Sequence, residues 1–225
     1  MLVSDLIGGY YDKKSSAEPE FGDIFFAEAY YAHENAEFFR AVSFEDNKTA
    51  THAKYFRIQT EKPFQHGIPL HTPKLETDEE FIVVRAKIRP VVLLQPHIEI
   101  TDIDTTGFKS PLYRKQSLVA QVFSVHHPVT KKPKFPPEFL ERIQQAEYSH
   151  LLYLPAYKEG VTTDSILRLD ACQSVFTARL QATGLTLHRD AKDLLRSQFQ
   201  CLVNDEYSGY YKLYRDEILG TIKKA

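Results

Sequence analysis

The chain has 225 residues, of which 43% are hydrophobic, and a formal charge of -2 at pH 7, so it can bury one substantial core. The near-neutral charge excludes a protein that coats nucleic acid indiscriminately, because such binding relies on many basic side chains, and any RNA site must therefore be a local patch. Two cysteines are too few for a secreted disulfide scaffold and no apolar run is long enough for a membrane span, so we expect a cytoplasmic protein with no membrane association.

The first third of the chain is predicted to contain one clear strand and one insertion. Residues 1–20 are expected to form a flexible lead-in, because a polar stretch with Pro19 precedes Phe21. A mostly apolar run predicts a buried strand over 21–31. The segment near 36–80 is interpreted as an insertion or accessory layer, with a strand over 52–60 and a loop rich in proline after it. Regular structure is expected to resume at 81–84.

A second buried strand is predicted to start at Pro90. Proline cannot donate to a sheet ladder, so it fits a strand's first residue, and Arg89 is placed at the strand mouth. Further strands are predicted over 97–104, 118–125, 149–156 and 164–175. Helices are predicted after Pro136-Pro137, over 187–202 and over 205–224. This order favours a mainly β class with added helices, as a single domain over 21–225.

Three motifs in this order resemble the PemK/MazF family, the ribonuclease toxins of bacterial toxin-antitoxin pairs. They are Gly22-Asp23-Ile24, Arg89-Pro90-Val91-Val92, and a late strand over 164–175 that is followed by Ala178-Arg179-Leu180. The resemblance covers roughly 21–31 and 88–203. It implies a small SH3-like curled β-barrel with C-terminal helices, and insertions near 36–80 and 127–148. It also implies an endoribonuclease toxin that cleaves single-stranded RNA, forms a homodimer and is controlled by an antitoxin protein.

The resemblance implies catalysis by 2′-hydroxyl attack, without a metal or any other cofactor. Arg89 is expected to stabilise the phosphorane through its guanidinium. Ser124 stands where the family usually has threonine and is expected to assist, and His126 is a candidate acid or base. The alternatives are a salt-bridged Arg89, a locally bonded Ser124 and exposed loop histidines. His126 and His127 are adjacent in the chain, so at most one of them can face the site.

RNA contacts are assigned to Arg85, Lys87 and Gln95, which flank Arg89 along the chain. For two further sets of candidate residues, a purely structural role is favoured over a functional one. Asp102 and Asp104 share one face of a predicted strand, as a cation site requires, yet no third ligand is evident and a solvated face is favoured. Several aromatic residues offer stacking platforms for bases, although core packing is the favoured interpretation: Tyr30, Tyr31, Phe38, Phe39, Tyr55 and Phe56.

Two other interpretations of the whole chain remain open. One is a catalytically silent PemK-like module that binds a protein or nucleic acid. It is favoured by serine in place of threonine at Ser124 and by the acidic balance, and the insertions would form its contact surface. The other is an unrelated β-rich protein. RNA cleavage and its dependence on Arg89 separate the first interpretation from the ribonuclease.

Overall fold

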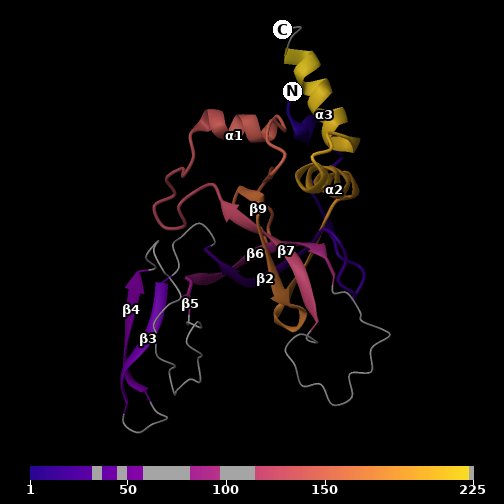
Figure 1. Cartoon of the computed structure of the whole chain (residues 1–225). Helices are drawn as coiled ribbons and strands as arrows, with labels where there is room; N and C mark the ends of the chain where they lie inside the picture. The colour runs from indigo at the N-terminus through magenta and orange to yellow at the C-terminus, as the bar shows by residue number, and fades with distance from the viewer. Residues whose placement is uncertain (32–36, 45–49, 58–81, 97–114, 223–225) are drawn as a thin grey trace. The chain divides into compact units, whose positions relative to one another are not determined.

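The structure is a computed structural model that describes residues 1–31, 37–44, 50–57, 82–96 and 115–222 (Figure 1). The chain forms two compact units. The larger unit comprises Met1–Ala29 and Ile88–Ala225, and the smaller comprises Tyr30–Lys87. The insertion predicted near 36–80 falls within the smaller unit. The strand predicted over 97–104, with Asp102 and Asp104, lies outside the described residues.

The larger unit is built on one sheet of seven strands. The pairs β1–β10, β10–β2, β6–β7, β7–β9 and β9–β8 are antiparallel. The strand order is β1 (Tyr11–Lys13), β10 (Gln181–Leu187), β2 (Asp23–Tyr30), β6 (Ala86–Gln95), β7 (Gln116–Ser124), β9 (Ser165–Phe176) and β8 (Leu151–Leu154). The sheet is open, with β1 and β8 at its edges. The mainly β class with helices is therefore confirmed, while the SH3-like barrel is not.

The central strand β6 explains the apolar run after Arg89. Val91, Val92, Leu93 and Leu94 are all buried, since both faces of the sheet are covered here. The expected strand start is wrong, because β6 begins at Ala86 and Pro90 lies inside it. The register with β7 starts at Val91, so proline precedes this ladder and removes no hydrogen bond from it.

One face of the sheet packs against two helices, which lie side by side in Figure 1. These are α2 (Arg189–Asn204) and α3 (Gly209–Ile222). Their buried side chains join Val92, Leu94 and Val122 in the main core: Ala191, Leu194, Leu195, Tyr211, Tyr214 and Ile218. Both predicted helices are thus confirmed. Leu187 ends β10 instead of starting α2, and Leu202 and Tyr207 are exposed.

The opposite face carries two smaller clusters. One contains Phe25, Ala27, Val91, Leu93 and Val119. The other is covered by α1 (Pro137–Gln144), whose Ile143 packs with the buried residues Val125, Leu151 and Ile166. The helix starts directly after Pro136, as the proline pair predicts.

The first twenty residues contribute to the fold of the larger unit. Val3 and Ile7 are buried in the main core, and Val3–Asp5 form a 3-10 turn (η1). The strand β1 pairs with β10. The segment predicted to be a flexible lead-in therefore supplies an edge strand and core side chains. A strand of three residues is too short to show an alternating pattern in sequence.

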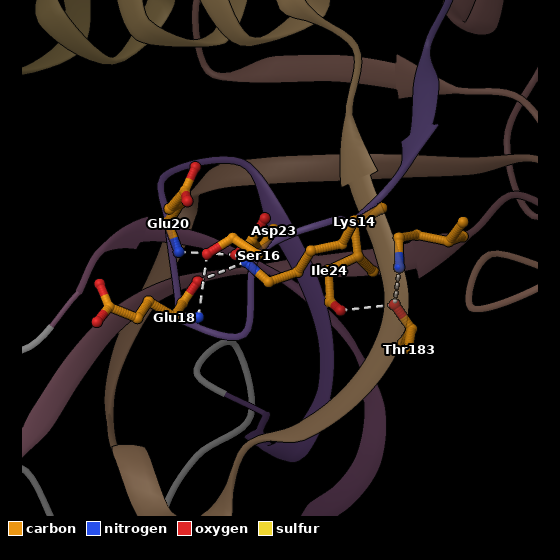
Figure 2. A network of polar contacts seen from close by, with 8 residues as sticks. Lys14, Ser16, Glu18, Glu20, Asp23, Ile24 and Thr183 are labelled. Atoms are coloured by element: carbon orange, nitrogen blue, oxygen red, sulfur yellow. Dashed lines mark hydrogen bonds and ion pairs between the residues drawn. The ribbon is translucent and has the colours of Figure 1, made fainter.

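The Gly-Asp motif is held between two neighbouring strands. Gly22 has a φ of +87°, a backbone conformation that glycine adopts without strain. Its N–H donates to the Leu93 carbonyl and its carbonyl accepts from Leu187 N, both at 2.8 Å. The following Asp23 is 1% exposed and forms an ion pair with Lys14 (Figure 2). The motif therefore links the start of β2 to β6, to β10 and to Lys14.

Strand β10 is absent from the sequence-based prediction. Its register with β2 shifts between Ala182 and Leu185. At this irregularity the Thr183 hydroxyl donates to the Ile24 carbonyl at 2.6 Å and accepts from Leu185 N at 3.2 Å, as Figure 2 shows. Gly184, with a φ of +78°, interrupts the alternation of side chains. Such a bulge obscures the period-two pattern that predicts a strand.

The smaller unit contains a sheet of three strands in the order β4-β3-β5. The strands are β3 (Glu37–Phe44), β4 (Ala50–Arg57) and β5 (Ile82–Val83). The strand predicted over 52–60 corresponds to β4. The register places Phe38 opposite Phe56 and Phe39 opposite Tyr55. Four of the six predicted stacking residues thus form two cross-strand pairs.

Candidate nucleic-acid interface

Arg89 lies on β6 in a buried setting. Its residue is 5% exposed, and its guanidinium carbon lies 4.3 Å from the centroid of the Phe123 ring. The register that pairs Val91 with Gln121 continues to place Arg89 opposite Phe123 on the same face of the sheet. Packing on an aromatic face thus accounts for much of its burial.

Ser124 is the last residue of β7 and is engaged in a local turn. Its hydroxyl donates to the His126 carbonyl at 2.8 Å and lies 3.1 Å from the Thr163 hydroxyl, which donates to it. Successive strand residues point to opposite faces, so Ser124 points away from the face that carries Phe123 and Arg89. The structure therefore does not bring Arg89 and Ser124 together.

The two histidines after Ser124 begin a short turn. His126 pairs with Pro133 across an isolated bridge, and its N–H donates to the Ser124 hydroxyl at 3.2 Å. His127 is exposed, and its Nδ1 accepts from the N–H groups of Val129 and Thr130. The alternative of exposed loop residues fits His127, whereas His126 is half-buried.

The predicted RNA contacts are divided between the two units. Arg85 and Lys87 are exposed but belong to the smaller unit, where the Arg85 guanidinium lies 5.4 Å from the Tyr31 ring. Gln95 is exposed at the far end of β6. It lies six positions after Arg89, a distance of about 20 Å in an extended strand.

A cavity opens on the same face as Arg89. Its volume is about 250 Å³, and it is lined by Phe123, Phe135, Phe139, His150, Leu151, Ile166, Arg168 and Asp170. The Phe123 ring is shared between the cavity and Arg89. A second guanidinium, that of Arg168, lies 5.2 Å from this ring. A mainly apolar cavity with a few polar groups is the usual form of a site for a planar ligand.

The aromatic wall of the cavity belongs to a continuous series of rings. Phe135 and Phe139 are 5.7 Å apart, and Phe139 lies 5.4 Å from Tyr148. Tyr148 lies 5.9 Å from His150, and the Arg142 guanidinium lies 5.1 Å from the same tyrosine ring. The rings come from both ends of α1 and from the approach to β8. The cavity is therefore set between helix α1 and the sheet.

An ion pair supplies the polar side of the cavity. Arg168 donates from Nε to Asp170 Oδ1 at 3.0 Å and from its terminal nitrogen to Oδ2 at 2.5 Å. These hydrogen bonds, with a smaller contribution from nearby His150, lower the pKa of Asp170. The same pair raises the pKa of Arg168. Asp170 is thus a carboxylate at neutral pH, an acceptor of hydrogen bonds only.

A basic hairpin leads directly into the cavity. We use this name for residues 126–134, closed by hydrogen bonds from His127 N to the Lys132 carbonyl and from Lys134 N to the Val125 carbonyl, both at 2.8 Å. Its side chains Lys131, Lys132 and Lys134 are exposed. No acidic residue occurs between Phe123 and Pro137 in the sequence. The chain therefore carries a local positive patch despite its net negative charge.

One sequence feature of this site is not among the motifs that resemble the PemK/MazF family. Three lysines within four residues are followed at once by Phe135 and then by Phe139. Basic residues next to aromatic residues are typical of single-stranded nucleic-acid binding. The family motifs lie outside segment 127–148, and the resemblance therefore predicts an insertion there. The partners of these rings on β9 could not be identified without the sheet register.

The comparisons with known proteins assign no family to the chain. No family model matches it, and no curated protein is similar to it. Among the residues that the structure describes, no helix is long and apolar enough to cross a membrane.

Proposed function

We propose that the chain is a PemK/MazF-like module that binds single-stranded RNA at the basic hairpin and the adjoining cavity. The observation that carries this proposal is the direct succession of three exposed lysines and two cavity-lining phenylalanines within residues 131–139. Lysines attract the phosphates, and aromatic side chains stack on unpaired bases. The family resemblance supports RNA as the ligand.

The geometry favours RNA binding without the RNA cleavage expected from Arg89 and Ser124. Catalysis by this pair requires both groups near one phosphate, and in the structure they face opposite sides of the sheet. Buried Arg89 instead positions Phe123 at the edge of the cavity. The catalytically silent module is therefore our first proposal.

The endoribonuclease remains the second candidate because Arg89 lies on the same ring that lines the cavity. A bound RNA would then run close to a buried guanidinium. If the chain is this ribonuclease, the family resemblance also implies an SH3-like barrel, a homodimer, an antitoxin protein as partner and a cytoplasmic location.

RNA cleavage distinguishes the two candidates. The parent protein and Arg89→Ala are each incubated with a long single-stranded RNA in EDTA, and the fragments are separated by electrophoresis. We expect intact RNA with both proteins, together with a retarded complex at higher protein concentration. Specific fragments with the parent alone would establish the ribonuclease and overturn the silent module.

Stacking in the cavity is tested by Phe139→Leu. Leucine keeps an apolar side chain beside α1 but removes the ring face, and stacking of one base on an aromatic ring contributes about 1–3 kcal/mol. We expect RNA affinity to fall by about tenfold in a fluorescence anisotropy titration. The matched control is Phe199→Leu on α2, a half-buried phenylalanine that packs against the main core. Equal affinities for the two variants would exclude the cavity as the binding site.

A further inference from the structure

The ion pair on the cavity wall has the form of a recognition edge for one base. Arg168 and Asp170 are two residues apart on β9, so both side chains project from the same face of the sheet. Their side chains are 32% and 38% exposed, and both line the cavity beside the phenylalanine rings. The cavity thus offers a carboxylate and a guanidinium next to an apolar surface that suits a planar ring.

The hydrogen-bonding capacity of the carboxylate is not exhausted by Arg168. An ionised carboxylate has about four acceptor positions on its two oxygens, and a guanidinium has five N–H donors. The two hydrogen bonds from Arg168 use one acceptor position on each oxygen, fix the plane of the carboxylate and hold it at the wall. A ligand bound here therefore meets acceptors from Asp170 beside donors from Arg168.

Among the four RNA bases, this pattern complements one Watson–Crick edge best. Guanine presents two adjacent N–H groups, which a carboxylate accepts together, and next to them a carbonyl oxygen, which a guanidinium donates to. Adenine and cytosine place an acceptor nitrogen beside their amino group. Uracil places a carbonyl oxygen on each side of its single N–H. In these three bases an acceptor would face the Asp170 carboxylate, which costs free energy because two acceptors repel each other.

We propose that the cavity binds an unpaired guanine base of the RNA, with its two adjacent N–H groups converging on one oxygen of Asp170 and its carbonyl oxygen accepting from Arg168. Phe123, Phe135 and Phe139 provide the apolar surface against which the base lies. The basic hairpin binds the phosphates next to that base. This inference rests on the proposed RNA-binding function and specifies which base the site selects.

The test compares eight-nucleotide RNAs of uridine that carry one central guanine, adenine or inosine, or uridine throughout. Affinities are measured by fluorescence anisotropy at one salt concentration. We expect guanine to bind at least about tenfold more tightly than adenine, as for a bidentate contact. Inosine lacks the amino group of guanine and is expected to lose most of this advantage.

Asp170→Asn is expected to abolish the difference between guanine and inosine. An amide has one acceptor oxygen, which Arg168 holds, so its NH₂ group would face the N–H groups of guanine. The matched control is Asp193→Asn, since Asp193 is paired with Arg196 at 3.0 Å on α2, outside the cavity. This control should keep the guanine preference. Thermal unfolding verifies that both variants are folded.

The possible outcomes test RNA binding, the preference for guanine and the nature of the ligand separately. Equal affinity for guanine and adenine would overturn the guanine assignment while RNA binding stands. Absence of binding to all four RNAs would overturn RNA binding and the guanine assignment with it. Guanosine monophosphate is added as a competitor, and we expect it to be at least about 100-fold weaker because it lacks the neighbouring phosphates. Equal potency would identify a free nucleotide, and not RNA, as the ligand.

Discussion

Replacing Asp23 by Asn is expected to lower the free energy of unfolding by about 3 kcal/mol, because removal of one partner leaves the other charge of a buried pair uncompensated. The Asp23 side chain is 2% exposed and that of its partner Lys14 is 12% exposed. An amide cannot neutralise the ammonium of Lys14. Urea denaturation followed by circular dichroism measures the loss.

The network around Asp23 explains why the effect should be large. Besides the ion pair, its carboxylate accepts from Glu20 N at 2.7 Å, and the Lys14 ammonium donates to the Glu18 carbonyl at 2.6 Å (Figure 2). These bonds fix the loop between β1 and β2. Loss of the carboxylate therefore affects both the charge balance and the loop.

An exposed ion pair provides the matched control. Lys212 and Asp216 lie one turn apart on α3, and each side chain is 51% exposed. Asp216→Asn should change the stability little, because solvent screens such pairs. The double variant Lys14→Met with Asp23→Asn should recover part of the loss, since it removes the uncompensated charge. Equal losses for Asp23→Asn and Asp216→Asn would contradict a stabilising role of the buried pair.

Only some elements of the fold carry a periodic pattern in the sequence. The buried run after Arg89 and the apolar stripes of α2 and α3 were identified because their periodicity follows directly from local geometry. Strand β1 has three residues and β10 contains a bulge at Gly184, so neither shows the pattern of a strand. Their positions depend on partners distant in sequence, which periodicity alone does not reveal.

The candidate site could likewise be predicted from the sequence only in part. Arg89 was singled out by a motif, and the structure gives it a buried position on Phe123. The family resemblance implies that Ser124 assists Arg89, although the alternation of strand residues directs Ser124 to the other face. The placement of Phe123 beside Arg168 and Asp170 requires the register of β7 with β9, which brings residues more than 40 positions apart onto one face.

Neutralising the basic hairpin is expected to have the largest effect on RNA binding. In the variant that combines Lys131→Gln, Lys132→Gln and Lys134→Gln, three phosphate contacts are lost. For single strands the logarithm of affinity falls with the logarithm of salt concentration by about 0.7 per phosphate neutralised, so the salt dependence should become shallower by about 2. Extended from 1 M down to 50 mM salt, this difference amounts to a loss of affinity of about 400-fold.

A control variant with the same change in net charge shows whether the effect depends on where the replaced lysines lie or only on how many are replaced. Lys13, Lys158 and Lys212 are exposed at three separate places of the larger unit. Their replacement by glutamine alters the net charge by the same amount, and it should leave the slope within about 0.5 of the parent value, since no phosphate contact is lost. Equal losses in both triple variants would show that RNA responds to overall charge alone. A loss confined to the hairpin variant, and vanishing near 1 M salt, would place the phosphates at the entrance of the aromatic cavity.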